Sequence, residues 1–383
     1  MTFDRSKNHL LARWWWTVDR LMLLAIFIMI GFGLMMVATA SPAIAERIGL
    51  DSFYFVKRQA IFLLLGVAVM FAVSLLPPVM IRRFGVMGFV IGLLFLLAVL
   101  VFGQEVNGAK RWLFIAGFSL QPSEFMKPFF IVFTSWVLAS NGQVRADIEQ
   151  FKYASLAYLL FVSLLVMQPD FGMTVVVTCV WAGQMFIAGL PFVWIGVLFF
   201  LAIAGALGAY MFLPHVAKRI DSFLQGGDGK AASYQVQKSL EAFYNGGLVG
   251  TGPGEGVIKQ KLPDSHTDFI FAVIGEELGA LACILLVCLV GFVVFRGLKR
   301  THGVHDMFVV YAISGLIMQF GLQAMVNMGV ALHLLPAKGM TLPFISYGGS
   351  SVLAICIAMG MILSLTRRRF GSPVPYSRRL MAT

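Results

Sequence analysis

Apolar residues occur along this chain in long blocks, separated by short stretches that carry charged residues, proline or glycine. Each block is close to the ~20 residues that a helix needs to cross a bilayer. The pattern predicts ten membrane-spanning helices, at residues 21–41, 59–77, 84–103, 122–140, 152–168, 171–188, 190–213, 268–295, 306–327 and 345–366. The chain is therefore predicted to be an all-α polytopic membrane protein, with one ten-span membrane domain over residues 21–366.

Lysine and arginine in the connections set the predicted orientation. With the first tail, residues 1–20, in the cytoplasm, that side receives sixteen basic residues, whereas the short outer connections hold six. The positive-inside rule then places both termini, including residues 367–383, in the cytoplasm. One outer connection, residues 214–267, is 54 residues long. A loop of this length usually has a function.

Composition narrows the class of protein further. The chain is 59% hydrophobic and 12% charged, which excludes an ordinary soluble domain. Its formal net charge of +11 does not indicate a nucleic-acid partner, because membrane topology already accounts for most of the basic residues. The four cysteines lie inside apolar blocks and predict neither disulfides nor a metal site. The first block is longer than a signal-peptide core, so an uncleaved first span is favoured.

The stretch KLPDSHTDFIF places Asp268 at the start of the eighth predicted span. A carboxylate at or next to a helix N-cap is stabilised by the helix dipole, so Asp268 is expected to be ionised and able to accept a proton. A plain helix cap is the alternative interpretation. The neighbouring His266 is a lone histidine, which predicts an orienting or packing role rather than a metal ligand.

Basic residues from separate stretches approach the same outer surface. They are Lys110 and Arg111 in NGAKRW, Lys127 in QPSEFMK, Lys218 and Arg219 in AKRI, and Lys259 and Lys261 before Asp268. Glu124 lies three residues before Lys127, so a surface ion pair with snorkelling cations is one interpretation. The functional alternative is an anion cradle for a phosphate-bearing lipid headgroup.

Two further acids, Glu276 and Glu277, lie within the eighth predicted span in the stretch GEELG. They are too far along the helix for paired-carboxylate chemistry with Asp268, at ~12 Å or more. Buried acids in a span can form a proton or ion relay, but a structural hydrogen-bonded role is favoured here. The flanking Gly275 and Gly279 have the spacing that allows helices to approach closely.

Several long stretches resemble the SEDS family (shape, elongation, division and sporulation) in the right order, from about Asp19 to Arg369. They are NGAKRWLFIAGFSLQPSEFMK, QPDFG, YQVQKSLEAFYNGGLVGTGPGEG, KLPDSHTDFIFAVIGEELG and LLPAKGMTLPFISYGGSS. The last stretch is more similar to the division branch of the family than to the elongation branch. One departure is Asp264, where the family often has glutamate.

The resemblance implies a peptidoglycan glycosyltransferase that polymerises lipid II at the periplasmic face of the bacterial inner membrane, at the division septum. It implies that Asp268 is the catalytic carboxylate and that Arg111, Lys127 and Arg219 line a central cavity. Lys110, Glu124 and His266 are taken as further residues near the substrate pyrophosphate. The implied partners are a class B penicillin-binding protein and other divisome proteins.

Alternative interpretations of the same residues lead to different functions. A lipid II flippase would use Glu276, Glu277 and Lys127 as a polar path, and a non-catalytic divisome scaffold would need only the tails and the outer loop. No certain cofactor is predicted, although a divalent cation, Mg²⁺ or Mn²⁺, could assist the departing pyrophosphate. The enzyme is favoured because the carboxylate and the cations share one face.

Overall fold

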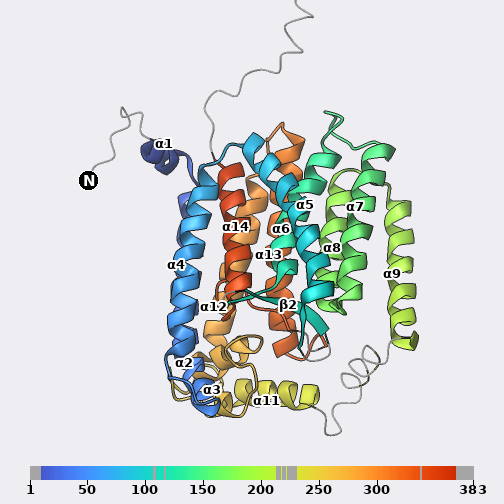
Figure 1. The fold of residues 1–383 in the computed structure, drawn as a ribbon. Helices are drawn as coiled ribbons and strands as arrows, with labels where there is room; N and C mark the ends of the chain where they lie inside the picture. The colour runs from blue at the N-terminus through green and yellow to red at the C-terminus, as the bar shows by residue number, and fades with distance from the viewer. Residues whose placement is uncertain are drawn as a thin grey trace, which may run out of the picture.

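The computed structural model describes residues 10–106, 109–115, 118–212, 217, 221, 231–336 and 339–367. In this part of the chain, helices occupy all ten predicted places: α2 (Arg20–Ala40), α4 (Tyr54–Leu75), α5 (Pro78–Phe102), α6 (Pro122–Leu138), α7 (Ile148–Met167), α8 (Phe171–Ile187), α9 (Phe192–Phe212), α12 (Ile270–Lys299), α13 (Met307–Ala331) and α14 (Gly349–Leu365). A short helix, α1 (Leu10–Thr17), precedes them, and α3 (Pro42–Arg47) follows α2. Figure 1 shows the long helices side by side in one bundle.

Six helical segments of the described chain are long and apolar enough to cross a membrane: α2 with α3, α4, α5, α7, α12 and α13. Two shorter apolar helices, α8 and α14, add to them. The chain is therefore a polytopic membrane protein. The count of ten spans stays a prediction, because α6 and α9 are not among these candidate spans.

Helices α13 and α14 form the centre of the bundle, and most of their residues are buried. Close backbone approach contributes to this packing: a Cβ on Gly360 of α14 would lie 2.7 Å from the Met70 carbonyl oxygen of α4. Small residues at such contacts let membrane helices pack by van der Waals contact. Helix α5, in contrast, exposes apolar side chains such as Leu94 and Val101, as expected of a surface that faces lipid.

A small antiparallel sheet lies between α5 and α6 and was not part of the all-α prediction. Its strands are β1 (Gln104–Val106), β2 (Ala109–Ile115) and β3 (Phe118–Leu120), in the order β1-β2-β3. Trp112 pairs with Gln104 and Leu113 pairs with Leu120. The outer strands are only 3 residues long, too short for a period-two pattern to be recognised in the sequence.

Residues 231–267 of the long outer loop are folded against the bundle. Helix α11 (Ala231–Gly246) lies across the end of the bundle opposite α1 (Figure 1), and a 3-10 turn, η1 (Ile258–Gln260), follows it. Ser239 Oγ donates a hydrogen bond to the Ala331 carbonyl of α13 at 2.7 Å. Phe243 contacts Phe271 of α12, with 5.6 Å between ring centroids. The loop is therefore part of the core at this end.

Helix α12 starts at Ile270 rather than at Asp268 and is broken at Gly279, where the sequence predicted an uninterrupted helix. The backbone of Gly279 has φ +77°, and a Cβ there would lie 2.4 Å from the Leu248 carbonyl oxygen. The outer loop bonds the backbone groups freed by the break: Thr251 N to Glu276 O (3.0 Å), Gly252 N to Glu277 O (2.9 Å), Ala280 N to Gly247 O (2.9 Å) and Leu281 N to Leu248 O (3.2 Å). Irregular backbone at this depth is tolerated because protein groups replace the lost helical hydrogen bonds.

The two ends of the described chain meet at the face opposite α11. Arg367 Nε donates a hydrogen bond to Thr17 Oγ1 at 3.0 Å, so the chain enters and leaves the bundle on one side. Next to this contact the buried Asp19 accepts hydrogen bonds from Arg296 and Arg300 at the end of α12. Burial opposes ionisation of Asp19, but the two arginines outweigh it and hold the pKa of this carboxyl below its usual value.

Candidate active site

Asp268 lies in the turn that leads into α12, next to the N-cap residue Phe269. Its carbonyl oxygen accepts a hydrogen bond from Asn327 Nδ2 of α13 at 2.8 Å. Its carboxylate lies beside the backbone of Gly339, since a Cβ on that glycine would be 3.1 Å from Asp268 Oδ2. The residue is half-buried, so α13 and the segment before α14 position a carboxylate that remains accessible.

The environment of Asp268 makes it a weak acid. Burial raises the pKa of Asp268 to about 7, and the negative charge of Asp264 adds to the rise. This pKa is higher than expected for an ionised carboxylate at a helix N-cap, because burial and Asp264 oppose the charged form and the N-cap of α12 is Phe269 rather than Asp268. A pKa close to neutral pH is what a general base requires, since such a group is both available and able to hold a proton.

Lys127 forms the centre of a buried polar cluster on α6. Its ammonium forms an ion pair with Glu124 Oε2 at 2.8 Å. It also donates a hydrogen bond to Gln323 Oε1 of α13 at 2.8 Å. The side chains of Lys127 and Glu124 are only 1% and 7% exposed, so the pair is buried rather than on the surface. Such a pair places ionic groups where the dielectric constant is low.

Arg111 reaches the same region from the sheet. Its guanidinium donates to the carbonyls of Gln168 and Pro169 in the α7–α8 turn, and lies 3.8 Å from Asp170 Oδ1. Burial raises the pKa of Asp170 in spite of this arginine. The preceding Lys110 is exposed, because successive residues of a strand point to opposite faces.

Two amide side chains of α13 bond these residues separately. Gln323 accepts the hydrogen bond from Lys127, and Asn327 donates to the backbone carbonyl of Asp268. Residues four apart share one helix face and are separated by about 6 Å along the axis, so the two anchor points lie one helical turn apart. Neither amide was predicted from the sequence, and nor was Asp170. The sequence pattern that could have indicated them is the row of amide side chains at Gln319, Gln323 and Asn327, repeated every four residues inside an apolar span.

His266 lies in an aromatic stack beside this site. Its ring centroid is 4.6 Å from that of Phe55 and 5.3 Å from that of Tyr347. Burial lowers the pKa of His266 to about 4, so the imidazole is neutral at neutral pH and brings no positive charge to a pyrophosphate. Its placement agrees with the packing role considered for it. Arg219 and Lys218 lie outside the described residues.

Glu276 and Glu277 bind the outer loop to α12. Glu276 accepts hydrogen bonds from four groups: Val257 N (2.8 Å), Ile258 N (2.9 Å), Lys259 N (3.3 Å) and Asn245 Nδ2 (3.0 Å). Glu277 forms a buried ion pair with Lys259 at 2.5 Å, and Lys259 also donates to the Thr39 carbonyl of α2. These contacts agree with the structural interpretation of both acids and account for the close approach at Gly275 and Gly279.

We expect Glu276→Ala to destabilise the outer loop. It would leave buried backbone amides without an acceptor, at a cost of about 1–3 kcal/mol for each unsatisfied group. Thermal unfolding of the purified protein in detergent should show a melting temperature several degrees lower. The matched control is Glu255→Ala in the same loop, which is exposed and should leave the melting temperature unchanged. An unchanged melting temperature for Glu276→Ala would contradict the structural role.

Comparison with known proteins places this architecture in a family. The family model described as "Cell cycle protein", whose name joins FtsW, RodA and SpoVE, matches residues 19–370. The chain is 42% identical over 371 residues to the probable peptidoglycan glycosyltransferase FtsW of Caulobacter vibrioides, covering 97% of this chain and 94% of the relative. It is 37% identical over 364 residues to the protein of the same name from Coxiella burnetii, covering 91% and 96%.

Solved structures agree with the sequence comparison. A chain from the study "Structural coordination of polymerization and crosslinking by a peptidoglycan synthase complex" superposes with a TM-score of 0.77 and 26% identity, over 91% of this chain and 97% of that one. The crystal structure of the rod shape determining protein RodA of Thermus thermophilus gives a TM-score of 0.68 and 25% identity, over 92% and 97%. By the match of the family model and the near-complete alignment with these relatives, the chain belongs to the SEDS family of polytopic membrane proteins, with FtsW among its relatives.

Proposed function

We propose that this protein is a peptidoglycan glycosyltransferase that polymerises lipid II into glycan strands, with Asp268 as its general base. The observation that carries the proposal is the half-buried carboxylate of Asp268, with a pKa of about 7. Its backbone is held by Asn327 of α13, one helical turn from Gln323, the partner of Lys127. The names of the Caulobacter and Coxiella relatives, both probable peptidoglycan glycosyltransferases, support the same activity.

In the proposed reaction, the base acts on the attacking hydroxyl of the acceptor and the cations act on the leaving pyrophosphate of the donor. Asp268 takes the proton from the 4-hydroxyl of the acceptor GlcNAc as that oxygen attacks the anomeric carbon of the donor MurNAc. The bond to undecaprenyl pyrophosphate breaks, and the pyrophosphate leaves with the electron pair. Fixed cations stabilise this developing negative charge most strongly where water is excluded. An inverting transfer of this kind needs one base and forms no covalent glycosyl-enzyme intermediate.

Of Arg111 and Lys127, Arg111 is the more accessible to the pyrophosphate, because its side chain is 25% exposed and that of Lys127 is 1% exposed. Lys127 is covered, so its charge would act through the low-dielectric interior or after Glu124 moves aside. Lys110 at the rim of the sheet and Arg219 in the outer loop are proposed as further pyrophosphate ligands. We assign His266 to the support of the Asp268 turn.

The assistance of a divalent cation remains a prediction. Among the described residues, His, Cys, Asp and Glu side chains do not gather in groups of three or more that could hold a metal ion. The described donor set therefore does not fit a metal held by the protein. No step of the proposed mechanism depends on one.

The proposed setting is the bacterial inner membrane at the division septum, with both termini in the cytoplasm and residues 214–267 in the periplasm. A class B penicillin-binding protein that cross-links the strands is the proposed partner, together with other divisome proteins. The contact between Arg367 and Thr17 supports a common side for the termini. The similarity to a chain of a peptidoglycan synthase complex supports the partnership.

The contacts of Glu276 and Glu277 favour the enzyme over a lipid II flippase. Both acids are held by the outer loop, so the polar path that a flippase would need loses two of its expected groups. The test is purified protein, with and without its penicillin-binding partner, supplied with labelled lipid II. Glycan polymer is the expected product. Translocation of lipid II in protein-only vesicles, with no polymer in either assay, would contradict the proposal.

We expect polymerisation by the wild-type protein to fall below pH 7. The base must be deprotonated, so the rate should decrease about tenfold per pH unit once the pH is below the pKa of about 7. Asp264→Asn removes a charge that raises this pKa and should move the acidic limb to lower pH, with the rate at pH 8 preserved. Asparagine also tolerates the positive φ of 56° at this position. If the acidic limb does not move, Asp264 does not influence the pKa of the catalytic base.

A further inference from the structure

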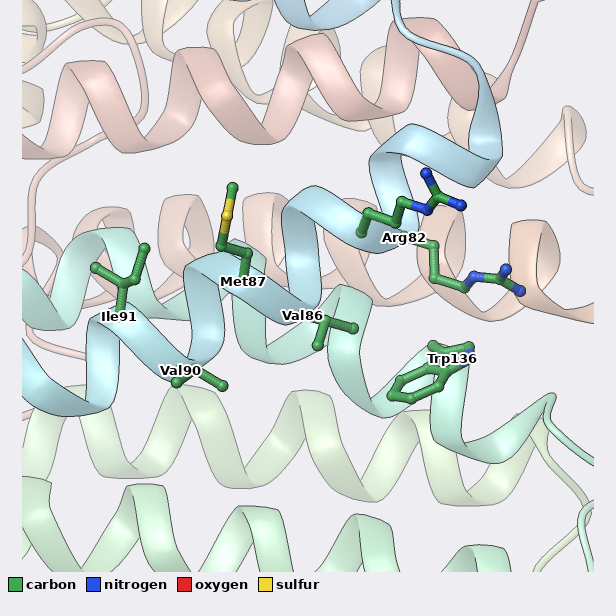
Figure 2. A pocket seen from close by; sticks show the side chains of 7 residues that line it. Arg82, Val86, Met87, Val90, Ile91 and Trp136 are labelled. Atoms are coloured by element: carbon green, nitrogen blue, oxygen red, sulfur yellow. The ribbon is translucent and has the colours of Figure 1, made fainter.

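A groove runs along the outside of α5 at the end of the bundle that holds both termini. Its cavity volume is ≈ 570 Å³, within the range typical of small-ligand sites. The lining residues are Arg82, Arg83, Val86, Met87, Val90, Ile91 and Trp136. Figure 2 shows Arg82 at one end of the labelled stretch of α5, Ile91 at the other, and Trp136 on the neighbouring helix α6.

The groove residues of α5 form one stripe, repeated every four residues. Arg82 and Arg83 head the stripe, and the apolar pairs 86/87 and 90/91 continue it toward the middle of the bundle. The apolar part is open to the surroundings: Met87, Val90 and Ile91 are 57%, 52% and 44% exposed. The stripe is about 14 Å long, comparable with a good part of an acyl chain.

The two arginines at the head of the groove have no ionic or hydrogen-bond partner within the described chain. Three arginines at or just after the ends of α12 and α14, in contrast, have partners at this end of the bundle. Arg296 and Arg300 both pair with Asp19, and Arg367 donates to Thr17. Guanidinium groups are suited to bidentate contacts with phosphate. Paired cations at the mouth of an apolar groove therefore select an amphiphile with an anionic head.

From this arrangement we infer that the groove binds an anionic glycerophospholipid of the leaflet on the side of the termini. Arg82 and Arg83 hold the phosphate, and Val86, Met87, Val90 and Ile91 contact an acyl chain. Trp136 lies where amphipathic aromatic side chains anchor proteins at the membrane interface. This is a lipid site separate from the proposed chemistry, since Trp136 lies nine residues, about 14 Å along α6, beyond Lys127.

Two alternative roles for the groove lead to different binding results. Arginines near a membrane interface can snorkel to water without binding any particular lipid, in which case headgroup charge would matter only in a general way. A lipid-linked pyrophosphate, which carries more charge and a prenyl chain, is the second occupant with matching chemistry. The glycerophospholipid is favoured because the groove opens at the membrane surface, far along α6 from the cations proposed for the substrate.

The experiment is native mass spectrometry of the full chain in a neutral detergent, titrated with phosphatidylglycerol or with phosphatidylcholine of the same acyl chains. Wild-type protein should bind the first phosphatidylglycerol with a Kd at least about tenfold lower than that for phosphatidylcholine. Both lipids carry the phosphate, but the positive choline group of phosphatidylcholine opposes binding next to two arginines. The double variant Arg82→Gln/Arg83→Gln should lose this preference. Val90→Trp, which fills the apolar groove, should weaken the binding while both arginines remain.

The matched control is Lys152→Gln/Lys299→Gln, which removes two exposed cations predicted on the same side of the membrane but outside the groove. It should bind phosphatidylglycerol as the wild type does. The site would be overturned if the control lost as much affinity for phosphatidylglycerol as the double arginine variant. It would also be overturned if the wild type bound both lipids with equal affinity. Undecaprenyl pyrophosphate that displaces phosphatidylglycerol at equal concentration would overturn the chosen occupant. Melting temperatures of all variants close to the wild type would exclude misfolding as the cause.

Discussion

Asp268→Asn should reduce the rate of lipid II polymerisation by about 10²–10⁴-fold, the contribution typical of a positioned general base. Asparagine has nearly the same shape as aspartate but cannot accept the proton of the acceptor hydroxyl. The backbone contact from Asn327 to the carbonyl of residue 268 would remain. The measurement is polymer formation by purified protein with its penicillin-binding partner and labelled lipid II, at pH 8, where the wild-type carboxylate is ionised.

The control for this variant is Asp264→Asn, which removes a carboxylate from the same turn and should keep its activity at pH 8. Both variants should unfold at temperatures close to that of the wild type. Removing a partly buried carboxylate with a raised pKa does not cost stability at neutral pH, since burial disfavours its charged form. Polymer formed by Asp268→Asn at the wild-type rate would remove Asp268 from the mechanism. Equal losses in both variants would indicate a structural role for the turn instead.

The membrane helices could be predicted because each one corresponds to a continuous block of apolar residues in the sequence. Helix ends differ by a few residues, as at α4, which begins at Tyr54 rather than at 59. The break in α12 could not be predicted in this way. Gly275 and Gly279 indicated close packing, but what they approach is α11 and the loop around Leu248, distant in sequence. The break depends on backbone groups of the loop that replace the helical hydrogen bonds. These groups are distant in sequence, so the residues of α12 alone do not predict the break.

The candidate site was predictable only in part, for the same reason. Ionisable residues beside apolar blocks indicated Asp268, Lys127 and Arg111. In the structure, Lys127 and the backbone of Asp268 each bond an amide side chain of α13. Those amides, and Asp170 beside Arg111, become meaningful only once separate helices lie together. The charge state of Asp268 is also a tertiary property. Position at a helix start favours ionisation, whereas burial and Asp264 oppose it more strongly.

Lys127→Met should abolish polymerisation and also destabilise the protein. The substitution removes the positive charge from the cluster and leaves Glu124 buried without a cation. Breaking a buried pair in this way typically costs about 3–5 kcal/mol of folding free energy. A single variant therefore does not separate a structural ion pair from a group that stabilises the departing pyrophosphate. The melting temperature in detergent and the polymerisation rate have to be measured together.

The double variant Glu124→Gln/Lys127→Met separates the two roles. It neutralises both partners, so no buried charge is left unpaired, and most of the lost stability should return. If Lys127 supplies positive charge to the transition state, the rate should still be lower by about 10²–10³-fold, the usual effect of removing one such electrostatic contact. A double variant that polymerises lipid II at the wild-type rate would reduce Lys127 to a packing role. The positive charge at the pyrophosphate would then be left to more exposed cations such as Arg111, whose side chain is 25% exposed, against 1% for Lys127.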